Sequence, residues 1–149
     1  MSAALHLGKP ADLDRLLPLV EAFHAEEGIT STDARRRAAL GPLLEGSPLG
    51  AVYLIGPSRG PIGYIVVTFG WSIEFGGMDG FIDELYIRPG VRGRGVGSEV
   101  ITALTAMLKS VGMTALHLEV APDNDKAIRL YTRARFKLRE GYHLMSRVL

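Results

Sequence analysis

Apolar residues in the first third of the chain recur at the three-to-four-residue spacing of a helix. After a short strand candidate at 5–8, this spacing predicts two helices, the second shorter than the first. The residues expected to cap, end or break them have suitable side chains or backbone freedom: Asp12, Gly28, Ser31 or Thr32, Gly41 and Pro42. The arginines at 35–37 are interpreted as the solvated side of the second helix.

The middle of the chain changes to the two-residue alternation of half-buried strands. Strands are expected at 51–55, 62–69 and 80–87, and the turn residues between the first two predict an antiparallel hairpin. The glycine-rich run at 76–80 is interpreted either as a mobile lid or as a turn. This part of the chain therefore favours antiparallel pairing.

The last part of the chain alternates between helix and strand patterns. A strong amphipathic helix is expected to end at Gly112, and a strand at 114–120 follows it. A last helix is entered through 121–125, and 142–148 is expected to form a final strand. The strand–helix–strand order implies that 80–87 and 114–120 lie parallel, with a ligand crevice near their carboxyl ends. The fold class is therefore α+β, or mixed α/β.

Composition and charge narrow the class of protein. At 149 residues, 47% hydrophobic and 22% charged, the chain is expected to be a single globular domain spanning 1–149. A formal net charge of +1 gives no reason to expect nucleic acid or a membrane as a partner. The absence of cysteine excludes disulfides and thiolate sites, and the four histidines lack ligand spacing, so no metal is expected. No transmembrane or signal pattern is seen, which makes a cytoplasmic protein the expectation.

The stretch "GVRGRGVGSE", residues 90–99, lies between a strand pattern and a helix pattern. Gly93, Gly95 and Gly97 are expected to let the backbone approach a ligand closely and to take dihedrals that other residues avoid, and N–H groups at the start of a helix form a cradle for an anion. Arg92 and Arg94 add planar donors suited to phosphate, whereas the alternative is a flexible turn with solvated arginines. The spacing matches neither the P-loop GxxxxGK[ST] nor the dinucleotide fingerprint GxGxxG.

The same stretch resembles the [RQ]xxGxG/A motif of the GNAT superfamily of acetyl-CoA-dependent N-acetyltransferases. The resemblance starts in "FIDELYIRPGVRGRGVGSEVI", which is closest to the diamine and polyamine acetyltransferase branch, and resumes in "LHLEVAPDNDKAIRLYTRARF". With the order of the first helices, it covers essentially the whole chain. It implies a mixed, mostly antiparallel sheet whose central parallel strands splay around the cofactor. One departure is Arg135, which stands where many relatives have a glycine.

The resemblance implies acetyl-CoA as the co-substrate. Its pantetheine would pair with strand backbone, and its pyrophosphate would lie on the N–H groups of the loop. Asn124 stands at the position of a cofactor-contacting asparagine and is also the expected cap of the last helix, and both roles can hold at once. The implied cofactor contacts are Leu85, Tyr86, Ile87, Arg92, Gly93, Arg94, Gly95, Val96, Gly97, Ser98, Asn124 and Tyr131.

The implied reaction is direct attack of a primary amine on the acetyl carbon through a tetrahedral intermediate. Tyr131 stands at the family's position for the acid that protonates the leaving thiolate, and core packing is its alternative role. A protonated amine also needs a base. Asp83 and Glu84 are expected to supply it as a pair, with Glu119 next and a water chain as the alternative. A regular strand would direct Asp83 and Glu84 to opposite faces, and a bulge would change this.

The acceptor amine would lie, by analogy, against the first two helices and the connection that follows the third strand. Acidic and aromatic residues there would suit a cation, and their alternative role is that of exposed helix-end and loop positions. The candidate contacts are His24, Glu26, Glu27, Trp71 and Glu74. Two alternatives to an N-acetyltransferase stay open: a non-catalytic acetyl-CoA-binding sensor or interaction module, and a nucleotide-binding domain of another type. The resemblance leaves a homodimer open.

Overall fold

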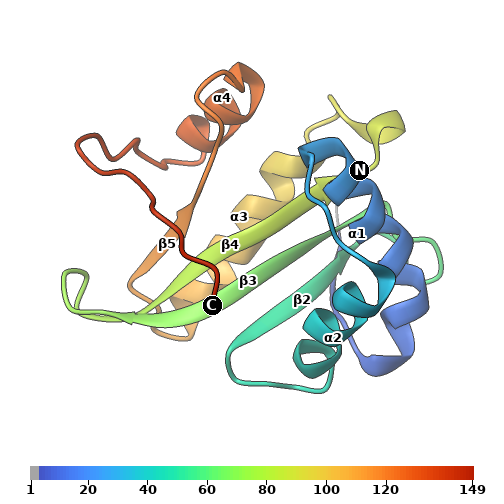
Figure 1. Ribbon diagram of the computed structural model, residues 1–149. Coiled ribbons are helices and arrows are strands. Elements are labelled where there is room, and N and C mark those ends of the chain that lie inside the picture. The colour runs from blue at the N-terminus through green and yellow to red at the C-terminus, as the bar shows by residue number, and fades with distance from the viewer. Residues whose placement is uncertain (1–3) are drawn as a thin grey trace. The chain divides into compact units, whose positions relative to one another are not determined.

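The computed structural model describes residues 4–149 and divides the chain into two compact units, one ending at Glu119 and the other running from Val120 to Leu149 (Figure 1). The first unit contains β1 (Leu5–Leu7), α1 (Leu13–Glu27), α2 (Asp33–Leu44), β2 (Gly50–Ile55), β3 (Gly63–Ser72), β4 (Gly77–Ile87), α3 (Val96–Ser110) and β5 (Ala115–Leu118). The second unit contains α4 (Asp125–Arg133). A single domain over 1–149 stays a prediction.

The first unit is built on a five-stranded sheet in the order β1-β2-β3-β4-β5. Neighbouring strands pair antiparallel except β4 and β5, which pair parallel. Helices α1 and α2 lie on one face of this sheet and α3 lies on the other (Figure 1). The predicted α+β class, with one parallel pair in a mostly antiparallel sheet, is confirmed.

The two faces of the sheet bury different side chains. Tyr64 and Val66 of β3 belong to the apolar cluster that α1 and α2 cover. Ile65 and Val67, which alternate with them, point to the opposite face, where α3 packs. Helix α3 is amphipathic, as its sequence predicted. The residues that it buries lie at helical spacing: Val96, Val100, Ile101, Leu104 and Leu108. Val111, one of the residues expected on this face, is exposed.

The connection between β3 and β4 is much tighter than the sequence suggested. The two strands pair as far as Ser72 with Gly77, so most of the run at 76–80 is strand, and the prediction of a lid or turn there is wrong. Only Gly76 lies in the turn, at φ 78°. Side chains pack closely against the backbone of Gly80, since a Cβ there would lie 3.0 Å from Met113 Cε and 3.1 Å from Leu116 Cδ1.

Helix α1 ends as predicted but starts differently. Gly28 follows its last turn in the left-handed conformation, at φ 69°. Asp12, the predicted cap, makes no capping bond to the helix; its carboxylate accepts from the Lys9 N–H at 2.9 Å and from Arg15 at 2.6 Å. The reason is a 3₁₀ turn over Pro10–Asp12, which moves the start of the helical backbone ahead of Asp12.

Helix α2 continues through the residues expected to break it. Thr32 caps its start by accepting from the Arg35 N–H at 3.1 Å, as one of the two predicted caps. The helix then passes Pro42 and reaches Leu44, so the predicted break is wrong. Leu40 and Leu44 are both buried in the core cluster, and this packing outweighs the poor helix propensity of proline.

The second unit contains α4 and a following segment without regular structure. Residues 142–148, predicted as a final strand, form neither strand nor helix. Its large apolar side chains, Tyr142, Leu144, Met145 and Val148, are exposed. The unit from Val120 to Leu149 contains no strand with which this segment could exchange backbone hydrogen bonds, and an isolated apolar segment does not form a strand alone.

Candidate active site

Strands β4 and β5 separate halfway along β4. Their parallel register runs from Asp79 with Ala115 to Ile82 with Leu118, where it ends. Strand β4 continues to Ile87 and, among the residues that the structure describes, pairs there with β3 on one side and with no strand on the other. The backbone of residues 83–87 therefore presents an unpaired edge on the side of β5, and this stretch contains the predicted cofactor contacts Leu85, Tyr86 and Ile87. An unpaired strand edge can accept an extended ligand by backbone hydrogen bonding.

A β-bulge in β4 decides where its two acidic residues lie. Val66 pairs with Glu84, and Val67 pairs with Ile82, so Asp83 is the extra residue without an opposite partner. Glu84 consequently shares the sheet face of Val66, which α1 covers, although a regular strand would place it on the face of Ile82. Asp83 is exposed, and its carboxylate makes no hydrogen bond or ion pair within residues 4–149.

The Glu84 carboxylate is held from two sides. Its Oε2 lies 2.7 Å from His24 Nε2, and its Oε1 accepts a hydrogen bond of 2.9 Å from the Tyr64 hydroxyl. The side chains of His24 and Glu84 are 13% and 16% exposed, so water competes little with these bonds. Tyr64 is fully buried, and its burial, together with the nearby Glu84 charge, raises the pKa of its phenol far above the usual 10. The phenol therefore stays a donor.

The second nitrogen of His24 continues this chain of contacts to the start of α2. His24 Nδ1 lies 2.7 Å from Ser31 Oγ. Arg36 Nη1 donates to Ser31 Oγ at 2.9 Å and to the Ser31 carbonyl at 2.8 Å. Arg36 is half-buried, so its interpretation as part of a solvated arginine run is wrong. Sequence reasoning missed Tyr64, Ser31 and Arg36, because no local pattern distinguishes these residues from core, cap and surface positions.

The glycine-rich loop presents a continuous row of free amides. Gly93 and Gly95 have φ of 78° and 80°, which L side chains rarely adopt, and open space lies where their Cβ atoms would be. The first helical bond of α3 is donated by Glu99 to the Gly95 carbonyl, so the N–H groups of 93–98 precede the ladder. None of these six donates to a carbonyl in the part of the chain that the structure describes. This is the geometry of an anion site at a helix N-terminus.

The two arginines of the loop are held differently. Arg92 donates through Nε to the Ile87 carbonyl at 2.7 Å and through Nη2 to Glu26 at 2.8 Å, and its guanidinium lies over the Tyr86 ring. Arg92 thus ties the loop to the end of β4 and to the last turn of α1. Arg94 is exposed, as Arg92 is, but its guanidinium makes no hydrogen bond or ion pair within residues 4–149. The structure therefore leaves the Arg94 donors available, whereas those of Arg92 are already used.

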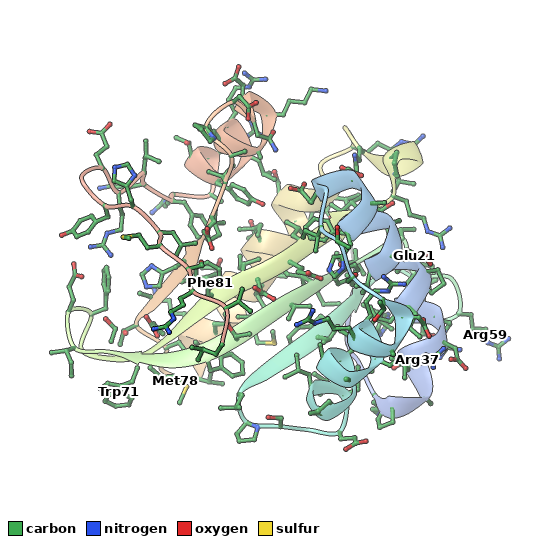
Figure 2. The ribbon with its side chains drawn as sticks, viewed as in Figure 1. Glu21, Arg37, Arg59, Trp71, Met78 and Phe81 are labelled. Carbon is green, nitrogen blue, oxygen red and sulfur yellow. The ribbon has the colours of Figure 1, made fainter. Side chains whose placement is uncertain are left out.

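The predicted acceptor contacts fall into two groups. His24 and Glu27 lie on the last turns of α1, whereas Trp71 and Glu74 belong to the β3–β4 hairpin, with Trp71 opposite Met78 at its far end (Figure 2). Met78 precedes Glu84 by six residues, a span of roughly 20 Å along a strand. Trp71 is 72% exposed and points away from the core. The structure does not bring the two groups together.

Glu119, the third candidate base, is an exposed residue directly after β5. His117 is the second-to-last residue of β5. Its Nε2 lies 3.2 Å from Asp79 Oδ2, and its ring makes an edge contact with the Phe75 ring. No cluster of three or more potential metal ligands is found within residues 4–149. The same residues include no helix with the length and apolarity of a membrane span.

The second unit contains the remaining two candidates. Asn124 caps α4 by accepting from the Ala127 N–H at 3.2 Å, which confirms its predicted capping role. The Tyr131 ring packs against Phe136 with 5.8 Å between centroids. Arg135, between them, takes a left-handed φ of 72°. This chain therefore uses an arginine where a glycine would be unstrained, and the turn after the helix is kept.

Comparisons with known proteins agree with this geometry. The family model for "Acetyltransferase (GNAT) family" matches residues 17–136. A Bos taurus protein, thialysine N-epsilon-acetyltransferase, is 31% identical over 78 residues, which cover 51% of this chain and 45% of that protein. The chain thus spans about half the length of the curated relative that it matches.

Solved structures extend the similarity over nearly the whole chain. An integron cassette protein from the mobile metagenome of Cole Harbour Salt Marsh has a TM-score of 0.83 at 30% identity, covering 97% of this chain and 90% of that one. A Clostridium acetobutylicum protein, described as a predicted acetyltransferase with acetyl-CoA, has a TM-score of 0.78 at 15% identity, covering 97% and 96%. At that identity the likeness supports the fold alone.

Proposed function

The chain belongs to the GNAT family of acetyltransferases, and on this basis we propose that it transfers the acetyl group of acetyl-CoA to a primary amine of a small molecule or peptide. One observation carries this proposal: six consecutive free amides at the start of α3 follow a strand whose outer edge is unpaired. A cofactor with a pyrophosphate and an extended pantetheine arm needs both features. The first supplies donors for the phosphates and the second supplies a backbone edge for the arm.

The loop residues would hold the pyrophosphate. Amides 93–98 supply donors, and the α3 macrodipole adds a favourable potential at the same place. Arg94 is accessible to a phosphate, while Arg92 keeps the loop in register with α1 through Glu26. Ser98, in the first turn of α3, adds a hydroxyl. Asn124 and Tyr131 complete the proposed cofactor contacts by resemblance.

The backbone of β4 and the side chains around it would handle the chemistry. Glu84, with Asp83 beside it and Glu119 as a further candidate, accepts the proton of the substrate ammonium, so that the free amine can attack the acetyl carbon. A β4 N–H near Leu85 stabilises the resulting oxyanion. The C–S bond then breaks as Tyr131 gives its proton to the thiolate, and the second proton on the attacking nitrogen passes to the Tyr131 phenolate, which leaves a neutral amide, a CoA thiol and a restored tyrosine. Of the acids, Glu84 is favoured because the bulge directs it to the α1 face and two donors orient it.

The acceptor is proposed to be a lysine-like or polyamine-like primary amine. The support is the 31% identity to a protein named for acetylation of thialysine, together with acidic residues at the end of α1. His24 and Glu27 are the proposed contacts at that end, and Trp71 and Glu74 would contact only an acceptor long enough to reach the hairpin. A homodimer stays open.

Calorimetric titration with acetyl-CoA, CoA and NAD, followed by thiol release across a panel of amines, tests the proposal. The panel contains thialysine, polyamines, amino acids, aminoglycosides and peptide amines. We expect binding of both CoA species, no binding of NAD, and turnover with at least one amine. Absence of CoA binding would overturn the proposal, and binding without turnover on any amine would favour a non-catalytic acetyl-CoA-binding module.

A matched pair of glycine variants shows whether the loop is the cofactor site. Gly95→Ala forces a side chain into a φ of 80°, which costs about 1–2 kcal/mol or turns the amides away. We expect the affinity for acetyl-CoA to fall about tenfold. Gly60→Ala, in a turn with open space and no positive φ, is the control and should bind normally. Equal affinities in the two variants would exclude the loop.

A further inference from the structure

A continuous chain of polar contacts crosses from α2 through the end of α1 to β4. It runs from Arg36 to Ser31, from Ser31 to His24, and from His24 to Glu84, which Tyr64 contacts from the other side. Every distance in it lies between 2.7 and 2.9 Å. The residues come from separate parts of the sequence, since His24 and Glu84 alone are 60 positions apart. Only the folded chain assembles this arrangement.

The groups at the two ends set the direction of the bonds between them. A carboxylate can only accept, so His24 Nε2 donates to Glu84 Oε2 and Tyr64 donates to the other oxygen. In a neutral ring Nδ1 then carries no hydrogen and accepts from the Ser31 hydroxyl, whose oxygen accepts in turn from Arg36. Of the two neutral tautomers of His24, only the one protonated on Nε2 satisfies all of these contacts.

This chain also fixes the orientation of the Glu84 carboxylate. Each oxygen accepts one bond from a nearly buried donor, so rotation about the terminal torsion would break both bonds. Each oxygen still has a second lone pair, which leaves the carboxylate able to take a proton. Asp83, next to it on the bulge, has no such support within the described residues and is exposed.

We propose that His24 is a positioning residue that holds Glu84 as the proton acceptor, and that Ser31 and Arg36 fix the His24 tautomer for this task. This proposal rests on the proposed acetyltransferase function. It assigns His24 to contact the base, Glu84, in place of the substrate contact proposed above. Misplacing a reacting group by about 1 Å can cost on the order of 10²-fold in rate. Loss of the contact between His24 and Glu84 should therefore lower kcat and leave the KM for each substrate unchanged.

Two amide substitutions separate the two ring nitrogens. The Gln amide nitrogen reaches the place of Nε2 and can still donate to Glu84, whereas the shorter Asn side chain reaches only the place of Nδ1. For His24→Asn we expect kcat to fall about 10²-fold with both KM values near normal, and for His24→Gln we expect most of kcat to be kept. The same substitutions at His117 are the control and should leave kcat unchanged. His117 pairs with Asp79, which lies on β4 as Glu84 does.

The contacts of Ser31 and Arg36, at the α2 end of this series of hydrogen bonds, are tested in the same way. Arg36→Lys keeps a donor for Ser31 and should keep kcat, whereas Arg36→Met and Ser31→Ala should lower it several-fold, less than His24→Asn. Thermal unfolding of each variant identifies those that lose structure. Equal kcat in His24→Asn and the unchanged protein would overturn the proposal, as would equal losses in His24→Asn and His24→Gln.

The tautomer can be read without any turnover. Two-bond ¹H–¹⁵N correlation in the free protein distinguishes a ring protonated on Nε2 from one protonated on Nδ1. We expect His24 to carry its proton on Nε2 and to lose this preference in Arg36→Met. A His24 ring protonated on Nδ1 would overturn the proposal. A protein that acetylates no amine would overturn the proposed function, while this spectrum still decides the hydrogen-bond chain.

Discussion

Two carboxylates of β4, Glu84 and Asp79, each pair with a histidine from another element, and the two pairs differ in their other contacts. His24 and Glu84 meet at 2.7 Å in a nearly buried place, with Tyr64 and Ser31 bonded to their remaining atoms. His117 and Asp79 meet at 3.2 Å, with their side chains 26% and 20% exposed, beside the edge of the Phe75 ring. The first pair is one segment of a longer polar chain. The second is a bridge between β4 and β5.

The difference shows why a histidine beside a carboxylate does not by itself indicate catalysis. In both pairs the two partners come from different elements of the first unit. Only Glu84 has each oxygen occupied by its own donor, and only His24 has each nitrogen occupied. A carboxylate held in this way loses little entropy when it meets a substrate, which is what preorganisation requires. The Glu84 pair is therefore the candidate for chemistry.

Removing the charge from the two carboxylates gives the largest expected contrast. Glu84→Gln should lower kcat by about 10²–10⁴-fold, because the amide cannot accept the ammonium proton. Asp79→Asn, the matched change at the other pair, should alter kcat by no more than about twofold. Steady-state thiol release with the amine that the screen identifies measures both.

Asp83→Asn completes this series because it removes the neighbouring acid on the bulge. Near-normal kcat in Asp83→Asn, with a large loss in Glu84→Gln, would confirm Glu84 as the base. The reverse result would assign the base to Asp83 and contradict the preference for the oriented carboxylate. Full activity in both would point to Glu119 or to a water chain.

Sequence alone predicted the parts of this site that depend on local geometry. Gly93, Gly95 and Gly97 were expected to adopt unusual backbone dihedrals; the first two do, whereas Gly97 lies in α3 without a positive φ. Asn124 and Thr32 cap helices as expected, because capping is decided within a few residues. The parallel pairing of β4 and β5 followed from the strand–helix–strand order.

The contacts that select among the acids could not be predicted in this way. "IDEL" reads as a regular strand, and the bulge at Asp83 arises only from its register with β3. Arg36 resembles its two exposed neighbours, and only the packing of α2 near His24 makes it half-buried. Pro42 was expected to break α2, yet the helix continues to Leu44, whose burial stabilises its last turn. Tertiary packing decides all three.

The second prediction concerns the hydrogen bond from Tyr64 to Glu84, which has no counterpart in the pair of His117 and Asp79. Tyr64→Phe removes the donor to Glu84 Oε1 and should lower the free energy of unfolding by about 1–3 kcal/mol at neutral pH. Tyr53→Phe, at a half-buried tyrosine on β2, is the control and should change it less.

The alkaline pH dependence sharpens this prediction. Folding raises the pKa of Tyr64 above its usual 10, so the folded protein keeps a proton that the unfolded chain loses above pH 10. This contribution to stability is complete below pH 10 and declines above it by about 1.4 kcal/mol per pH unit. The stability difference between the unchanged protein and Tyr64→Phe should therefore narrow above pH 10 in urea unfolding. A constant difference would show that the phenol is not held as a donor.

The smallest effect is expected for the coupling between His117 and Asp79. A double-mutant cycle with His117→Gln and Asp79→Asn should give less than about 1 kcal/mol, because both side chains are partly exposed and share a single contact. The equivalent cycle with His24→Asn and Glu84→Gln should give a larger value, because each change also leaves a nearly buried partner without its donor or acceptor. Urea unfolding at pH 7 measures both cycles. If the two coupling free energies were equal, the extra partners of His24 and Glu84 would add nothing to their interaction, and the distinction between the two pairs would rest on position alone.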